Sequence, residues 1–113
     1  MTTLAFDVYG TLINTHGVVS ALQELVGDQA KAFSNTWRDK QLEYSFRKGL
    51  MQNYETFAVC TSQALDYTCA CYGTSLNAGQ KQELMSLYRV LPAFDDVKEA
   101  LRRLQNSGFR LYA

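Results

Sequence analysis

The residues that could carry out chemistry lie together near the start of the chain. Asp7 falls within a short apolar run of strand-forming residues, from Thr3 to Val8, and Gly10 and Thr11 follow that run. Parallel sheets in α/β proteins bind their ligands beyond the carboxyl ends of the strands, where we expect Asp7 to stand. A carboxylate there can act as a covalent nucleophile and divide one difficult displacement into two easier steps. Gly10 would let the backbone approach a bound group closely.

The same segment also has a purely structural interpretation. Asp7 could cap its own turn and Thr11 could do likewise, because both residue types bond to nearby backbone groups in loops. The residue types alone leave nucleophile and turn residue equally well supported. The single histidine, His16, lies just before the first expected helix and fits a turn or hinge better than a catalytic role.

Most of the chain between its two apolar ends shows helical spacing. One expected helix runs from Val18 and stops at Gly27, and a second is capped by Asp28 and runs to about Lys48. A further strand is expected near the end of the chain. The remaining expected elements are a helix from about Asn53 to Tyr72, one capped by Asn77, one that opens at Asp95 or Asp96 and stops at Ser107 and Gly108, and the strand 109–112.

The order of elements predicts an α/β fold with a helical bundle inserted after the first strand. We expect residues 1–14 to form the first core strand and the nucleophile loop. Residues 15–91 would form a four-helix domain, and residues 92–113 would begin the returning core. Two strands do not make a stable α/β sheet, and Ala113 falls in the middle of an apolar strand. We therefore expect these residues to be the first portion of a longer protein.

Composition argues against several classes of partner. The 11 basic and 11 acidic side chains cancel, and no run of like charge predicts a nucleic-acid surface. No apolar run approaches the ~20 residues that span a bilayer, and the first residues lack the pattern of a signal peptide. Three cysteines without a CxxC pair do not predict a zinc site. We expect a cytoplasmic protein with reduced thiols.

The segment from Asp7 to Leu12, preceded by Leu4-Ala5-Phe6, resembles the first motif of the haloacid dehalogenase superfamily. That motif has the form Asp-x-(Asp or another residue)-Gly-Thr-Leu. The helical stretch resembles the cap domain that closes over the active site in this superfamily. The resemblance implies a haloacid dehalogenase-like Rossmannoid core with an inserted helical cap, and it implies that Asp7 is the nucleophile.

Tyr9 indicates which branch of the superfamily the chain resembles. The phosphatases carry a second Asp at this position, which protonates a leaving alkoxide and then activates water. An alkoxide leaves poorly without a proton, whereas a halide leaves as the free ion and needs only solvation. Tyr9 therefore favours cleavage of a carbon–halogen bond. It also weakens the case for magnesium, and we expect no metal or other cofactor.

The segment from Trp37 to Phe46 resembles a cap helix of the L-2-haloacid dehalogenases. By that resemblance Arg38 holds the departing halide, and Leu42 and Phe57 line the pocket for the alkyl group. A guanidinium suits a halide because it is permanently charged and weakly hydrated. The alternative is that Arg38 is a surface residue that pairs with Asp39 or nearby acids. Tyr9 would bind the substrate or, equally, pack beneath the cap.

The resemblance implies an (S)-2-haloacid dehalogenase that acts on short 2-haloalkanoic acids through an aspartyl ester. Asp7 would be catalytic, and the substrate-binding residues would be Tyr9, Thr11, Arg38, Leu42 and Phe57. Backbone N–H groups near Tyr9 and Gly10 would help to hold the substrate carboxylate, and a homodimer is expected. Further family residues (a hydroxyl residue with a neighbouring Asn, a lysine and an acidic loop) would lie beyond these 113 residues. The isolated polypeptide should therefore show negligible turnover.

Three other interpretations remain open at this point. A phosphatase of the same superfamily, such as a phosphoglycolate phosphatase, would hydrolyse p-nitrophenyl phosphate with magnesium. A non-catalytic helical module would mediate association instead, and the chain could also be a remnant without a role. Magnesium-dependent phosphatase activity would identify the first alternative, and light scattering would show association without excluding a dehalogenase.

Overall fold

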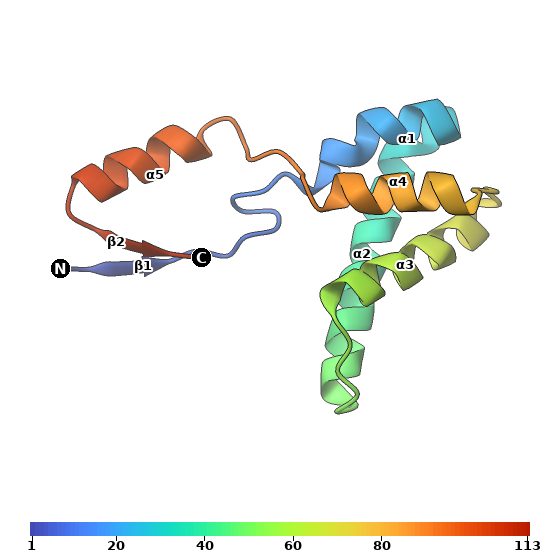
Figure 1. The fold of residues 1–113 in the computed structure, drawn as a ribbon, viewed down its shortest axis with the longest axis horizontal. Coiled ribbons are helices and arrows are strands. Elements are labelled where there is room, and N and C mark those ends of the chain that lie inside the picture. Colours follow the sequence, from blue (N-terminus) through green and yellow to red (C-terminus); the bar gives the residue numbers. More distant parts are fainter. The chain divides into compact units, whose positions relative to one another are not determined.

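The computed structural model describes residues 1–113, and the chain divides into two compact units (Figure 1). The strand unit consists of Met1–Gly17 and Leu91–Ala113, and the helical unit is Val18–Val90. The sequence analysis divided the chain into domains after residues 14 and 91. These domain boundaries stay a prediction, because the two units are groups of residues in mutual contact and are not domains in that sense.

The strand unit contains a parallel pair of short strands and one helix. β1 (Thr3–Ala5) pairs with β2 (Arg110–Tyr112), with Leu4 opposite Leu111. The N–H of Phe6 donates to the carbonyl of Tyr112 at 2.9 Å, so the pairing continues one residue past β1. Parallel neighbours need a crossover connection, and here α5 (Val97–Asn106) is its last helix, which lies alongside the strands (Figure 1) and leads into β2. Both expected strands are confirmed, although the first ends before Asp7.

The helix α5 has two distinct faces. Val97, Leu101 and Leu104 are half-buried, whereas the charged residues of the helix are exposed. This spacing places the apolar side chains on one stripe, as expected of a helix that covers a sheet. The helix begins after Asp96 and is followed by Ser107, as the sequence predicted, but no side chain caps its first turn.

The helical unit is built from four helices: α1 (Val19–Val26), α2 (Ala30–Leu50), α3 (Phe57–Tyr72) and α4 (Ala78–Tyr88). Short 3₁₀ turns precede α1 (Thr15–Val18) and α2 (Gly27–Gln29). The long α2 packs against α3 and α1, and α4 packs against α3. The largest fully buried side chains, all from this unit, are Trp37, Phe33, Leu22, Leu65, Leu84 and Gln41. No helix of the chain combines the length and the apolar character that crossing a bilayer requires.

Several predicted helix ends are confirmed and two need correction. Gly73 ends α3 in the left-handed conformation, at φ +61°, and Asn77 forms a reciprocal capping box with Gln80 at the start of α4. The expectation that Asp28 caps α2 is wrong, because it lies in the preceding 3₁₀ turn and no side chain caps that helix. The helix expected from Asn53 begins only at Phe57, since the Thr56 hydroxyl accepts the N–H of Val59 and caps it there.

Candidate active site

Asp7 lies just past the end of β1 with its carboxylate exposed to solvent. The Thr11 hydroxyl donates to its Oδ2 at 2.8 Å, and none of the ion pairs in the chain involves Asp7. The other oxygen, Oδ1, accepts no hydrogen bond from the chain. One carboxylate oxygen is therefore oriented by a neutral donor while the other is open to an incoming group.

The loop that follows Asp7 is folded around the carbonyl of Val8. That oxygen accepts the N–H groups of Thr11 at 3.2 Å, Leu12 at 2.8 Å and Ile13 at 3.0 Å. The turn is thus closed by a backbone carbonyl. The structural interpretation of the sequence had Asp7 cap this turn, and the Asp7 side chain does not do so. The carboxylate is exposed to solvent.

Gly10 is the residue of this loop with a positive φ. Its φ of +89° lies in the region that side chains with a Cβ rarely adopt. Its N–H donates to the carbonyl of Ile13 at 2.8 Å. This N–H, which we expected to help hold a substrate carboxylate, is therefore taken up within the loop.

Tyr9 and Thr11 share the loop with Asp7, and both are exposed. The Tyr9 side chain is 41% exposed, and its backbone forms a bridge with Ile13. The structure thus brings together three of the six predicted site residues, which are close in sequence.

The other three predicted site residues lie in the helical unit. Arg38 and Leu42 are half-buried and one helical turn apart on α2, and Phe57 is the first residue of α3. Arg38 Nη1 donates to the side-chain oxygen of Gln41 at 2.7 Å. The guanidinium is therefore bonded to a neutral amide. The surface interpretation of Arg38 had named only acidic partners, Asp39 or nearby acids.

A hydrogen-bond network links two of these positions, the Arg38 side chain and the Phe57 backbone. The Gln41 amide nitrogen donates to the Thr61 hydroxyl at 2.5 Å, and that hydroxyl donates to the Phe57 carbonyl at 2.8 Å. The Tyr88 hydroxyl donates to the Gln41 oxygen at 3.1 Å. Sequence reasoning missed this network. The one signal was a polar residue, Gln41, on the same helical stripe as Trp37.

Charged groups elsewhere on α2 form partly exposed pairs. Lys40 lies 2.6 Å from Glu43, which also pairs with Arg47 at 2.6 Å. The hydrogen bond from Lys40 lowers the pKa of Glu43, and the same bond raises the pKa of Lys40. Lys40 also lies 4.5 Å above the ring of Tyr67. These contacts support a structural role for Lys40 on α2.

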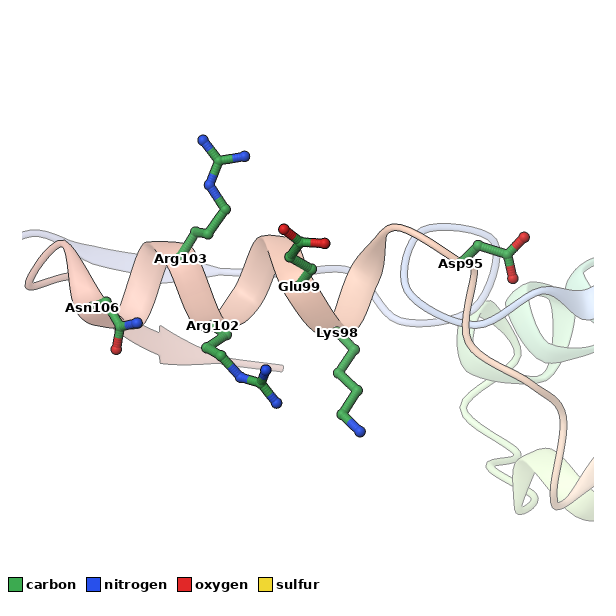
Figure 2. Close-up of a pocket in the computed structure, with 6 residues that line it drawn as sticks. All are labelled: Asp95, Lys98, Glu99, Arg102, Arg103 and Asn106. Carbon is green, nitrogen blue, oxygen red and sulfur yellow. The ribbon is translucent and has the colours of Figure 1, made fainter.

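The surface of α5 carries a hollow that is lined mainly by charged side chains. Its lining side chains spread away from one another along one helix and the turn before it, and both signs of charge are present (Figure 2). They are Asp95, Lys98, Glu99, Arg102, Arg103 and Asn106. None of the predicted site residues is among them, so this hollow is not the candidate active site. No group of three or more His, Cys, Asp or Glu residues is placed to hold a metal ion.

Comparisons with known proteins agree with this arrangement. The model of the haloacid dehalogenase-like hydrolase family matches residues 1–113. An (S)-2-haloacid dehalogenase from Pseudomonas putida is 41% identical over 108 residues, which are 96% of this chain and 48% of that protein. The chain spans about half the length of the curated relatives it matches.

Solved structures of related enzymes have the same fold over this length. A crystal structure of an L-2-haloacid dehalogenase superimposes with a TM-score of 0.91 at 31% identity, over 98% of this chain and 51% of that one. The L-2-haloacid dehalogenase of Xanthobacter autotrophicus gives a TM-score of 0.86 at 28% identity, over 98% and 45% of the two chains. The predicted fold class, part of a haloacid dehalogenase-like core with a helical cap, is confirmed. The chain belongs to the family of haloacid dehalogenase-like hydrolases.

Proposed function

We propose that this chain supplies the nucleophile of an (S)-2-haloacid dehalogenase, which hydrolyses the carbon–halogen bond of short 2-haloalkanoic acids. One observation carries the proposal. The Asp7 carboxylate is exposed, free of ion pairs and held at one oxygen by Thr11, in a loop with Tyr9 where the phosphatases carry a second acid. The names of the relatives support the same assignment.

In the first step, an oxygen of Asp7 attacks C2 of the substrate from the side opposite the halogen. A carbon–oxygen bond forms as the carbon–halogen bond breaks, and the halide departs with the bonding electron pair. The configuration at C2 is inverted, and the product of the step is an aspartyl ester. The Thr11 hydroxyl, 2.8 Å from Oδ2, fixes the rotation of the carboxylate and so directs the attacking oxygen.

In the second step, water adds to the side-chain carbonyl carbon of the ester. The bond between that carbon and the ester oxygen then breaks, which releases the 2-hydroxy acid and a proton and restores the Asp7 carboxylate. The oxygen in the product therefore comes from Asp7, and an oxygen from water replaces it. This route needs no acid to protonate the leaving group in the first step, which accords with Tyr9 in place of a second Asp.

Three residues of the helical unit have roles in the same proposal. Arg38 stabilises the departing halide, since a guanidinium is a weakly hydrated cation with several N–H donors. Leu42 and Phe57 provide apolar surface for the alkyl group of the substrate. Tyr9 contacts the substrate beside the nucleophile.

The cellular setting is also part of the proposal. The free thiols of Cys60, Cys69 and Cys71 suit a reducing compartment such as the cytoplasm. We propose a homodimer that acts on a small haloacid and uses no metal.

The test measures halide release. Since the chain spans about half the length of its relatives, the assay uses residues 1–113 fused to the remaining half of the Pseudomonas putida relative. The fusion should release chloride from (S)-2-chloropropanoate and not from the (R) enantiomer. Asp7→Asn should abolish release, and Asp28→Asn, the same change at an exposed turn residue, should not.

The rival activity is measured on the same preparations. Magnesium-dependent hydrolysis of p-nitrophenyl phosphate without halide release would contradict the proposal and favour a phosphatase. The 113-residue chain alone should show no halide release above background, because the relatives carry as much sequence again.

A further inference from the structure

Gln41 is an uncommon residue for the position it occupies. Its side chain is 0% exposed, in a core otherwise formed mainly by apolar residues. A buried amide is costly unless its hydrogen-bonding groups have partners. All of the buried side-chain polar atoms in the chain do have partners, so the interior is arranged around this amide.

The partners of Gln41 determine which way its amide faces. The Arg38 guanidinium can only donate, so the atom 2.7 Å from its Nη1 must be the amide oxygen. The amide nitrogen then faces Thr61 at 2.5 Å. The Thr61 hydroxyl accepts this N–H and sends its own proton to the Phe57 carbonyl at 2.8 Å. Each donor therefore meets an acceptor only in this one orientation.

Three helices hold the amide in this orientation. Gln41 comes from α2, Thr61 from α3 and Tyr88 from α4, and the Tyr88 hydroxyl donates to the same oxygen as Arg38. Trp37 braces the partners, because its indole N–H donates to the Thr61 carbonyl at 2.9 Å and its ring lies 4.8 Å from the Tyr88 ring. The oxygen offered to Arg38 thus belongs to the packed core.

The neutral charge of this acceptor matters as much as its position. A carboxylate there would bind the guanidinium more strongly, but it would also cancel the charge that a halide needs. An amide oxygen directs an N–H group while adding no negative charge of its own. This combination suits a cation that must be oriented and still attract an anion.

We infer that Gln41 is a positioning residue for Arg38: it holds the guanidinium in the orientation that receives the departing halide. The inference rests on the proposed function, because it takes from it the role of Arg38. It extends that function to an amide that is fully buried in the helical unit.

A test of orientation needs no catalysis and uses the 113-residue chain itself. The measurement is the ¹⁵N relaxation of the Arg38 Nε–H group by NMR. In the unchanged chain this group should be as ordered as the backbone of α2. Gln41→Met keeps the side-chain length but removes the amide, and it should increase the mobility of the Arg38 Nε–H group above that of the α2 backbone. Gln82→Met, the same change at an exposed position of α4, should alter nothing.

A test of function compares leaving groups in the fused enzyme described above. Chloride is a poorer leaving group than bromide and depends more on stabilisation. Gln41→Met should lower kcat for 2-chloropropanoate by about 10-fold or more, lower kcat for 2-bromopropanoate less, and leave KM nearly unchanged. A purely structural role would lower both activities by the same factor.

Gln41→Glu separates orientation from charge and keeps the test decisive if Gln41→Met does not fold. Its carboxylate retains acceptors for Arg38, so the Nε–H group should stay ordered. Chloride release should nevertheless fall, because the added charge offsets that of the guanidinium. Order that is retained in Gln41→Met, or chloride release that is retained in Gln41→Glu, would overturn the inference.

Arg38→Met in the fused enzyme distinguishes failure of the inference from failure of the proposed function. If Arg38→Met leaves the ratio of chloride to bromide rates unchanged, the halide role of Arg38 is wrong. If Arg38→Met shifts that ratio and Gln41→Met does not, only the positioning role of Gln41 is wrong.

Discussion

Replacement of Thr61 by valine should destabilise the helical unit through a single lost acceptor. Valine matches threonine in shape and branching, so packing and helix propensity change little. The Gln41 amide N–H, now 2.5 Å from the Thr61 hydroxyl and 0% exposed, would lose its partner without gaining water. A buried donor left unsatisfied costs about 1–3 kcal/mol. With a urea m-value of about 2 kcal/mol/M, the unfolding midpoint should fall by roughly 0.5–1.5 M.

Urea unfolding followed by tryptophan fluorescence measures this loss, because Trp37 is the only tryptophan and is buried in the same unit. Thr68→Val is the matched control. Thr68 is also a buried threonine of α3, and its hydroxyl donates to the carbonyl one turn earlier, that of Ala64. The Thr68 hydroxyl accepts no hydrogen bond comparable to the one that Thr61 accepts from Gln41. Thr68→Val should therefore lower the free energy of unfolding by less than about 1 kcal/mol. Equal losses for the two variants would refute the energetic importance of the buried amide.

Two further predictions concern groups outside the network. Cys71 is exposed, whereas Cys60 and Cys69 are buried, and burial raises the pKa of the Cys69 thiol. One of the three thiols, that of Cys71, should therefore react rapidly with a disulfide reagent at neutral pH. Rapid reaction of all three would contradict the packing of α3. The Lys40 hydrogen bond lowers the pKa of Glu43. The pair therefore stabilises the fold at pH values above the ordinary pKa of a Glu carboxyl, and this stabilisation is lost as the pH falls through the lowered pKa. Glu43→Gln should therefore lower the urea midpoint at neutral pH and have less effect near about pH 3; an equal effect at both would contradict it.

The sequence predicted best those features that neighbouring residues determine. Gly27 and Gly73 ended helices as expected, and Asn77 began one, because each acts through its own backbone or a residue three positions away. The loop of Asp7 and Thr11 was identified for the same reason. The two residues are four positions apart, and their hydrogen bond lies within one turn.

Two local errors show where spacing misleads. Tyr54 falls within the helix expected from about Asn53, but it is 82% exposed and precedes α3. A pattern of apolar spacing treats every aromatic residue as facing inward, including one that precedes the helix. The start of α3 is set instead by the side-chain cap at Thr56. Asp28 had the right residue type for a cap, but the chain forms a 3₁₀ turn there instead.

The buried network could not be predicted from the sequence. Gln41 lies 20 residues from Thr61 and 47 from Tyr88, and only the packing of three helices brings their polar atoms together. A glutamine on an apolar stripe indicates a buried amide, but nothing local names its partners. The resemblance that suggested Arg38 carried no information on what holds it.

The identity of the nucleophile is tested most directly by a single turnover in ¹⁸O-labelled water. The fused enzyme, in excess over (S)-2-chloropropanoate, is digested after the reaction and the peptide that contains Asp7 is weighed by mass spectrometry. An aspartyl ester predicts one heavy oxygen in the Asp7 carboxylate and none in the alcohol oxygen of the product. Heavy oxygen in the product and an unlabelled Asp7 would show that water attacks carbon directly, and would contradict Asp7 as the nucleophile.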